Sequence, residues 1–266
     1  MPYNCRDICG FIDEYAPPQL ALEGDPIGLH LGSYNQTVNR LFMALELTPD
    51  VAREALEFQP DMIVLHHTPF FQPIKQLLEG RGHDRIVLEL IRSGVALYTA
   101  HTNLDCVKGG VNDALAEKLG LTDTEVLKPL NQSITDAGLG RIGMLKAPTA
   151  LGDFAAAIKK ALGAKWVRYC GDGSQKSYKV ALCGGAGAFL ISEAVACGAD
   201  TFVTSDVSHH EGVMALELGL GLIDAGHFAT ENQIIPVLAD WLRGRLPGLA
   251  IGLSAISGDP FSDSTI

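Results

Sequence analysis

The chain has 266 residues, of which 47% are hydrophobic and 19% charged, and its formal net charge is −11. Such a composition is that of a soluble globular protein long enough for one large domain or two modest lobes. The acidic balance would repel a phosphate backbone, which argues against nucleic acid as a general partner. No apolar run reaches membrane-spanning length and the first residues carry no signal pattern, so we expect a cytoplasmic protein without a membrane partner.

The first half of the chain predicts alternating helices and strands. Helices are expected over residues 5–15, 51–58, 84–93 and 111–119, and strands over residues 26–32, 41–47, 62–65 and 95–100. Thr48-Pro49-Asp50 is typical of a helix start, with Thr48 as N-cap and Pro49 in the first turn. The strands on either side of that helix form a β-α-β unit and should be parallel neighbours.

The second half repeats this alternation after a polar stretch at residues 122–137. We place the boundary between two lobes there, as residues 1–126 and 127–266. Strands are expected over residues 141–145, 166–170, 179–183, 201–204 and 220–223. Helices are expected over residues 151–162 and 189–197, from the segment 208–211 to residue 218, and from residue 227 to about 243. The pattern predicts an α/β protein with mixed, largely parallel sheets.

Residue types that commonly bind metals follow two of the predicted strands. His66 and His67 come directly after one apolar run, and His101 and Asp105 follow the next. In open α/β sheets, ligands gather outside the carboxyl ends of the strands. The repetition at two neighbouring strand ends therefore indicates a metal site more strongly than either motif alone.

His227 and Glu231 stand four positions apart at the start of a predicted helix, so both project from one face. A carboxylate favoured by the helix dipole, beside a helix-entry histidine, would give the same pattern. With His66, His67 and Asp105, however, the set exceeds the needs of one tetrahedral zinc. It would serve two ions bridged by Glu231 or Asp105, with water completing each shell.

Nitrogen and oxygen ligands suit zinc, iron, manganese, cobalt or nickel, and the sequence leaves the metal open among these. Two such ions about 3.5–4 Å apart would activate a bridging water as a nucleophile. This is hydrolase chemistry.

The sequence allows two interpretations for several polar residues near these motifs. His101 is a proton shuttle or substrate contact, or a core histidine that bonds a backbone carbonyl. His210 could play the same catalytic part or lie outside the site, whereas His209 is expected at the surface. Ser205 and Asp206, at a strand end, could bond a ligand or cap the following helix.

The glycine run Gly184-Gly185-Ala186-Gly187 joins a predicted strand to a helix, as a phosphate-binding loop would. It lacks the third glycine of a dinucleotide fingerprint and the lysine of a P-loop. Close packing of strand against helix explains the run equally well.

Taken together, the motifs resemble the Nif-three-like dinuclear metal proteins, which are often labelled GTP cyclohydrolase I type 2 homologues. The resemblance extends from residue 28 to about 242 and rests on His66-His67-Thr68-Pro69, His101-Thr102-Asn103-Leu104-Asp105, Gly109-Gly110-Val111-Asn112 and Gly226-His227-Phe228-Ala229-Thr230-Glu231. It implies two interlocked three-layer α/β lobes, a metal site in the cleft between them, and a toroidal homohexamer. The ligands that it implies are His66, His67, Asp105, His227 and Glu231.

The resemblance is incomplete at one segment. Family members usually have Thr-Gly-Glu before a tyrosine-histidine pair, whereas this chain has Thr204-Ser205-Asp206 and then His209-His210. His210 takes the place of the matching histidine.

Two functions from different classes agree with these residues. The first is a metal-dependent hydrolase of a small molecule, such as a nucleotide or another phosphorylated or heterocyclic compound. The second is a non-catalytic, metal-holding regulatory or scaffold oligomer. An open coordination position favours the enzyme, and fully saturated ions favour the scaffold.

Overall fold

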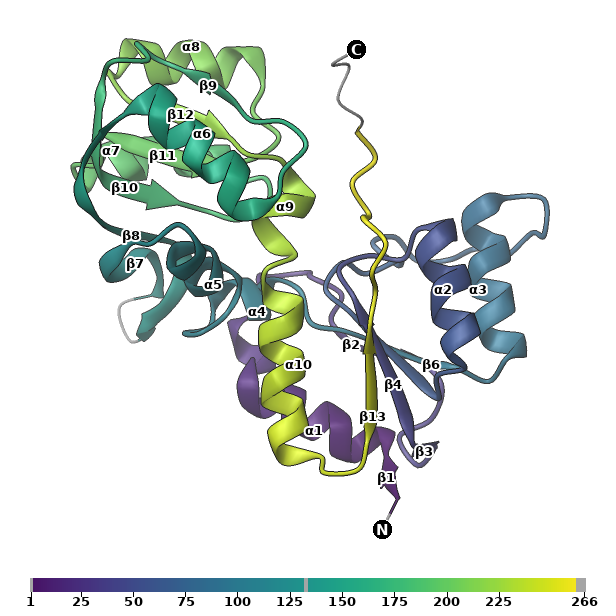
Figure 1. The fold of residues 1–266 in the computed structure, drawn as a ribbon. Coiled ribbons are helices and arrows are strands. Elements are labelled where there is room, and N and C mark those ends of the chain that lie inside the picture. The colour runs from purple at the N-terminus through teal and green to yellow at the C-terminus, as the bar shows by residue number, and fades with distance from the viewer. Residues whose placement is uncertain (1, 132–133, 262–266) are drawn as a thin grey trace. The chain divides into compact units, whose positions relative to one another are not determined.

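Figure 1 shows the computed structural model, which describes residues 2–131 and 134–261. By the density of its contacts the chain divides into two compact units, residues 1–104 with 235–258 and residues 105–234 with 259–266. The sequence predicted a single boundary between residues 126 and 127. The two divisions differ in residues 105–126, which belong to the second unit, and in residues 235–258, which return to the first unit.

The first unit is built on a five-stranded sheet in the order β13-β4-β5-β6-β2. Its strands are β2 (Gly28–Leu31), β4 (Arg40–Ala44), β5 (Met62–Leu65), β6 (Ala96–Thr99) and β13 (Ala250–Leu253), and β1 (Tyr3–Asn4) pairs separately with β3 (Thr37–Val38). Neighbours from β13 to β6 are parallel, and β2 is antiparallel to β6. The predicted parallel pairing across the β-α-β unit is confirmed.

Helices cover both faces of this sheet (Figure 1). They are α2 (Pro49–Phe58) and α3 (Gly82–Arg92) on one face, and α1 (Cys5–Tyr15) and α10 (Ile234–Arg245) on the other, with a short 3₁₀ turn η1 (Pro18–Leu20). As expected, α2 starts with Thr48, whose Oγ1 accepts the Val51 N–H at 3.2 Å. Among residues 2–131 and 134–261, no helix has the length and apolar character needed to cross a bilayer.

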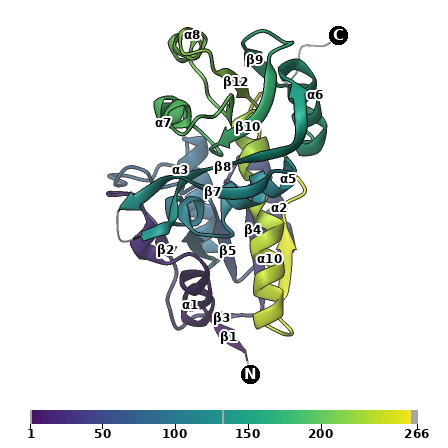
Figure 2. The same cartoon turned by 90° about the vertical axis from the view of Figure 1, so that its left-hand side faces the viewer.

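The second unit holds a six-stranded sheet in the order β7-β8-β10-β11-β12-β9. Figure 2 shows α7 and α8 on one side of this sheet and α6 on the other. The elements are β7 (Thr122–Asn131), β8 (Ile134–Ala150), β9 (Arg168–Cys170), β10 (Lys176–Leu182), β11 (Thr201–Thr204), β12 (Gly221–Asp224), α5 (Val111–Lys118), α6 (Leu151–Leu162), η2 (Ala188–Leu190), α7 (Ile191–Ala196) and α8 (His209–Glu217).

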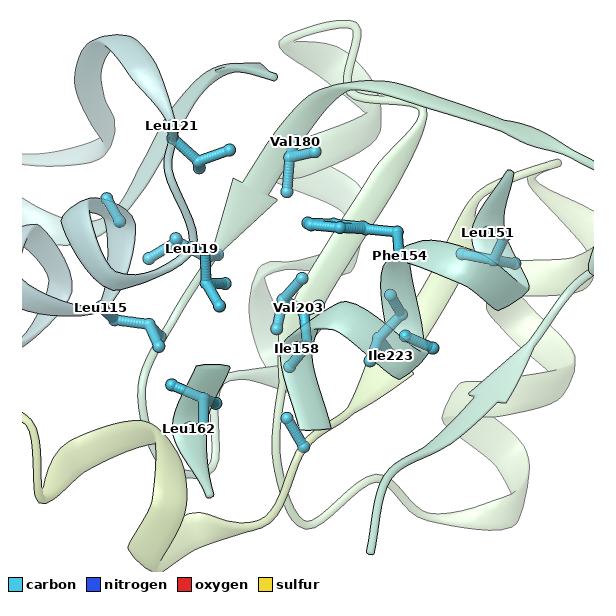
Figure 3. Close-up of a cluster of buried hydrophobic side chains, with 14 residues drawn as sticks. Leu115, Leu119, Leu121, Leu151, Phe154, Ile158, Leu162, Val180, Val203 and Ile223 are labelled. Carbon is cyan, nitrogen blue, oxygen red and sulfur yellow. The ribbon is translucent and has the colours of Figure 1, made fainter. Parts of the chain in front are cut away.

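Alternation along the central strands divides the core of the second unit into two layers. Val180 and Leu182 pack with α5 and α6, whereas Ala181 between them packs with α7 and α8. Side chains of a strand point alternately to opposite faces, which produces this division. Figure 3 shows the α6 layer, with Phe154 against Val203.

Residues 122–131 and 134–137 form structure that the sequence did not predict. β7 and β8 pair antiparallel through these residues. Leu127 is the one residue of β7 that is buried, and most of the others are exposed. A strand with so little buried surface shows no apolar alternation, so its sequence looks like a polar connection.

Candidate metal centre

Three histidines of the first unit lie together at the carboxyl ends of β5 and β6. The ring centroids are 5.0 Å apart for His66–His67, 5.2 Å for His66–His101 and 5.7 Å for His67–His101. One ring nitrogen of each lies within 4.8 Å of the others, close enough for the group to hold a metal ion. We call these three residues the imidazole cluster. Neighbouring parallel strands end at the same sheet edge, which is why the two motifs meet.

The backbone and one carbonyl fix the orientation of His66. The N–H groups of His66 and His67 donate to the Leu45 carbonyl at 3.1 and 2.8 Å. His66 is buried, and its Nδ1 lies 2.8 Å from the Ala100 carbonyl oxygen. Since a carbonyl only accepts, Nδ1 carries the proton in this bond. Nε2 is therefore the ring nitrogen that could bind a metal.

His101 is oriented by a carboxylate, Asp25, which the sequence did not single out. His101 Nδ1 lies 2.7 Å from Asp25 Oδ1, and the Thr102 N–H donates to Asp25 Oδ2 at 3.0 Å. Burial would raise the pKa of Asp25, but the hydrogen bonds from His101 and Thr102 outweigh it and hold that pKa below its usual range. Nδ1 is thus occupied and Nε2 is the ring nitrogen left for other chemistry. Of the two interpretations of His101, bonding to a backbone carbonyl is the one this geometry does not support.

The second unit contributes Asp105, His227 and Glu231, which we call the carboxylate set. Asp105 lies in the short helix α4 (Thr102–Cys106), and the other two begin and end α9 (His227–Glu231). His227 Nε2 is 3.0 Å from Glu231 Oε2, as the four-residue spacing predicted. Burial raises the pKa of the Cys183 thiol, and the charges of Asp105 and Glu231 raise it further. Both carboxylates therefore act on the same buried thiol.

Asp206 is hydrogen-bonded to the other ring nitrogen of His227, Nδ1. Its Oδ2 lies 2.6 Å from His227 Nδ1, and its backbone has a φ of 56°, in the left-handed region. Burial would lower the pKa of His227, but the bonds to Glu231 and Asp206 outweigh it and raise that pKa to about 10. Asp206 does not cap α8, since Ser208 does so. The interpretation of Asp206 as a polar contact of the site is the one that fits.

Asn112 connects Asp105 to the glycine run. Its Nδ2 donates to the Asp105 carbonyl at 3.0 Å, and its Oδ1 accepts the Gly184 N–H at 2.9 Å. The next residue, Asp113, accepts hydrogen bonds from Arg141 Nε at 2.9 Å and Nη2 at 2.7 Å. These residues anchor the start of α5 beside Asp105, and nothing in their local sequence indicated that part.

The glycine run is a packing feature and not a phosphate cradle. The N–H groups of Gly184, Gly185 and Gly187 already donate to side-chain oxygens. The acceptors are Asn112, Thr230 and Thr204, respectively. A Cβ on Gly185 would lie 2.1 Å from Glu231 Oε1, and the φ of Gly185 is +64°. The run therefore lets the backbone approach the carboxylate set closely.

His210 and His209 lie at the exposed start of α8, with ring centroids 5.5 Å apart. Surface exposure was expected for His209. Within the part of the chain that the structure describes, no hydrogen bond or ion pair joins His210 to the carboxylate set. Its catalytic part stays a prediction.

The donors of each set are of the types that bind a divalent cation. His66, His101 and His227 each direct Nδ1 to an oxygen acceptor, of Ala100, Asp25 and Asp206 respectively. Histidines that ligate metals almost always have their second ring nitrogen bonded in this way, because the bond fixes the tautomer and the ring orientation. Imidazole and carboxylate donors suit the first-row divalent metals.

The fold and these donors define an α/β protein with residues that could hold metal ions. The model of the family Duf34/NIF3 (NGG1p interacting factor 3) matches residues 3–260. The chain belongs to this family.

Relatives and solved structures agree with that assignment. A Lactococcus lactis protein named GTP cyclohydrolase 1 type 2 homolog is 35% identical over 254 residues, covering 94% of this chain and 96% of the relative. A Clostridium acetobutylicum protein of the same name is 32% identical and covers 94% of each chain. The crystal structure of a Bacillus cereus protein related to NIF3 superposes with a TM-score of 0.93 at 26% identity, covering 99% of this chain and 100% of that one.

Proposed function

We propose that this protein is a metal-dependent hydrolase of a small molecule and that it uses two divalent ions. His66 and His67 of the imidazole cluster, with the carboxylate set, are the ligands we assign. The observation that carries the proposal is the oriented imidazoles, whose Nδ1 atoms are bonded to oxygen acceptors. When bound, the ions would polarise the substrate and lower the pKa of a bound water toward neutrality.

His101 has a different part from the ligands in this proposal. Its bond to Asp25 keeps the proton on Nδ1, so Nε2 can accept or donate a hydrogen bond toward a substrate or a water beside His66 and His67. Asp25 is then a positioning residue, and Thr102 holds it in place.

The names of the relatives support a heterocyclic substrate. Proteins named GTP cyclohydrolase 1 type 2 homolog match nearly the full chain. Opening the ring of a purine needs an activated water, which a pair of divalent ions can supply. GTP therefore belongs among the compounds to be tested, beside phosphoesters and cyclic amides.

The hydrolase proposal is tested by turnover of the metal-loaded protein on that panel. We expect the rate to fall at least ~100-fold in His67→Ala and in Glu231→Ala, because several kcal/mol of transition-state stabilisation leave with the ions. Asp172→Asn, an exposed change in the second unit, should keep the wild-type rate.

Equal residual rates in wild type and both ligand variants would remove the hydrolase proposal. If removal of the metal by a chelator then lowered the melting temperature, the remaining function would be the non-catalytic scaffold. The close packing of Glu231 against Gly185 favours this second candidate, because it couples a metal ligand directly to the fold.

Asp206→Asn should weaken metal binding by about 10–100-fold, the usual effect of losing an outer carboxylate partner of a ligating histidine. The amide lacks the charge that holds His227 Nδ1–H. Competition with a fluorescent chelator measures the affinity, and Asp172→Asn is the control for a surface carboxylate of the same unit. Wild-type affinity in Asp206→Asn would show that His227 needs no such partner.

A further inference from the structure

An exposed aromatic ring lies against the imidazole cluster. The Phe71 side chain is 57% exposed, and its ring centroid lies 5.6 Å from that of His101 at an interplanar angle of 75°. This is a near-perpendicular contact of the kind that aromatic rings favour. His101 therefore covers only part of Phe71, which remains exposed.

Hydrogen bonding and packing fix the backbone before Phe71, which determines the position of its ring. The buried Thr68 accepts the Phe70 N–H through Oγ1 at 3.0 Å. Phe70 packs against the core of the first unit, and its ring lies 5.4 Å from that of His30 and 6.5 Å from that of His83. The two adjacent phenylalanines therefore differ: Phe70 packs against the core, and Phe71 is exposed.

Exposed apolar surface continues after Phe71 along the same segment. Ile74 and Leu78 are each 46% exposed. Exposed apolar side chains that follow one another along a segment can mark a binding surface.

We propose that Phe71 is the substrate-binding residue that stacks a planar aromatic or heteroaromatic ring beside the imidazole cluster. The proposal rests on the proposed hydrolase function and names its substrate class. Phe71 offers a π-face at the cluster, and any flat ring can stack on such a face whatever its hydrogen-bonding edge. His101 Nε2, on the adjoining ring, would then face the atoms at the rim of the stacked ring.

Binding of guanosine and of ribose 5-phosphate to the metal-loaded protein, measured by titration calorimetry, tests the proposal. Guanosine has the planar ring without a phosphate, and ribose 5-phosphate has the phosphate without the ring. We expect Phe71→Ala to raise the Kd for guanosine about 10-fold and to leave that for ribose 5-phosphate unchanged, as loss of one base-aromatic stack does. Phe71→Trp should restore the affinity for guanosine.

Tyr34→Ala is the matched control, because Tyr34 is an exposed aromatic of the same unit that contacts Arg6 instead of the cluster. Metal content must equal that of wild type in every variant. The proposal is overturned if Phe71→Ala binds guanosine as wild type does, or weakens both probes equally. It is also overturned if the wild-type protein binds none of guanosine, adenosine, cytidine and nicotinamide at millimolar concentration, or if Phe71→Ala changes only the mass of the assembly in light scattering.

The two proposals fail separately. Turnover of a non-aromatic substrate that is insensitive to Phe71→Ala removes the stacking residue and leaves the hydrolase. Guanosine binding that depends on Phe71, without turnover of any compound, leaves the stacking residue and removes the hydrolase.

Discussion

Gly185→Ala should lower the free energy of unfolding by about 1–3 kcal/mol and weaken metal binding at the same time. The new Cβ would lie 2.1 Å from Glu231 Oε1 and 3.2 Å from His227 Nε2, at a φ of +64°. Either the backbone or the carboxylate must move, and both movements displace a ligand. Urea unfolding of the metal-free protein gives the first effect, and titration with zinc gives the second.

Gly163→Ala separates the backbone strain from the contact. Gly163 follows α6 with a φ of +63°, and nothing lies within 4 Å of a Cβ built there. It should cost about 1 kcal/mol of stability, the strain of a left-handed alanine, and leave the metal affinity unchanged. The interpretation of the glycine run as packing against the carboxylate set fails if both variants bind zinc as wild type does.

Arg141→Met should lower the free energy of unfolding by about 3–5 kcal/mol, because it removes the buried cation that pairs with Asp113 and donates to several backbone carbonyls. Arg141 is 2% exposed. Its guanidinium bonds both oxygens of Asp113 and the carbonyls of Val107, Gly138 and Gly140. Chemical denaturation of the variant measures the loss.

Two further variants show whether the buried position is the cause. Arg53→Met removes a 67% exposed arginine paired with Asp50 and should change the stability by no more than about 1 kcal/mol. Replacing both partners, as Arg141→Met with Asp113→Leu, should recover part of the loss because no unpaired charge remains. Equal effects of Arg53→Met and Arg141→Met would contradict the assignment of Arg141 as an anchor.

The elements whose apolar pattern directly reflects their burial were predicted well. β5 is apolar at all four positions and buried on both faces, and its predicted bounds agree with the structure. α6 also has the predicted bounds, because Phe154, Ile158 and Leu162 recur at helical spacing and Gly163 ends it in the left-handed conformation. In such segments the local pattern and the tertiary packing give the same signal.

The parts that were missed depend on partners distant in sequence. β13 joins the sheet beside β4, some two hundred residues earlier in the chain, and its few apolar residues give no sign of that pairing. Asp25 meets His101 across 76 positions, and Asp206, which the sequence offered as a ligand contact or a helix cap, bonds His227 across 21. A carboxylate near a turn has many ordinary explanations, so its part in orienting a histidine appears only once the chain is folded.

The candidate ligands were found because histidine at a strand end is rare enough to be noticed. Their supporting residues are common types in ordinary positions. Asn112, for example, carries two hydrogen bonds that connect Asp105 with Gly184, yet asparagine near a helix start is unremarkable in a sequence. Sequence patterns therefore identify the donors more readily than the residues that orient them.

The interruption of the first unit has a consequence for the way this protein is made. Residues 105–234 are nested inside it, between Leu104 and the returning segment 235–258. As the polypeptide emerges from the ribosome, one side of β4 stays uncovered until β13, its parallel neighbour some two hundred residues later in the chain, has been synthesised. Most of the nested unit is made before β13, so we expect the first unit to be completed late although its synthesis starts first.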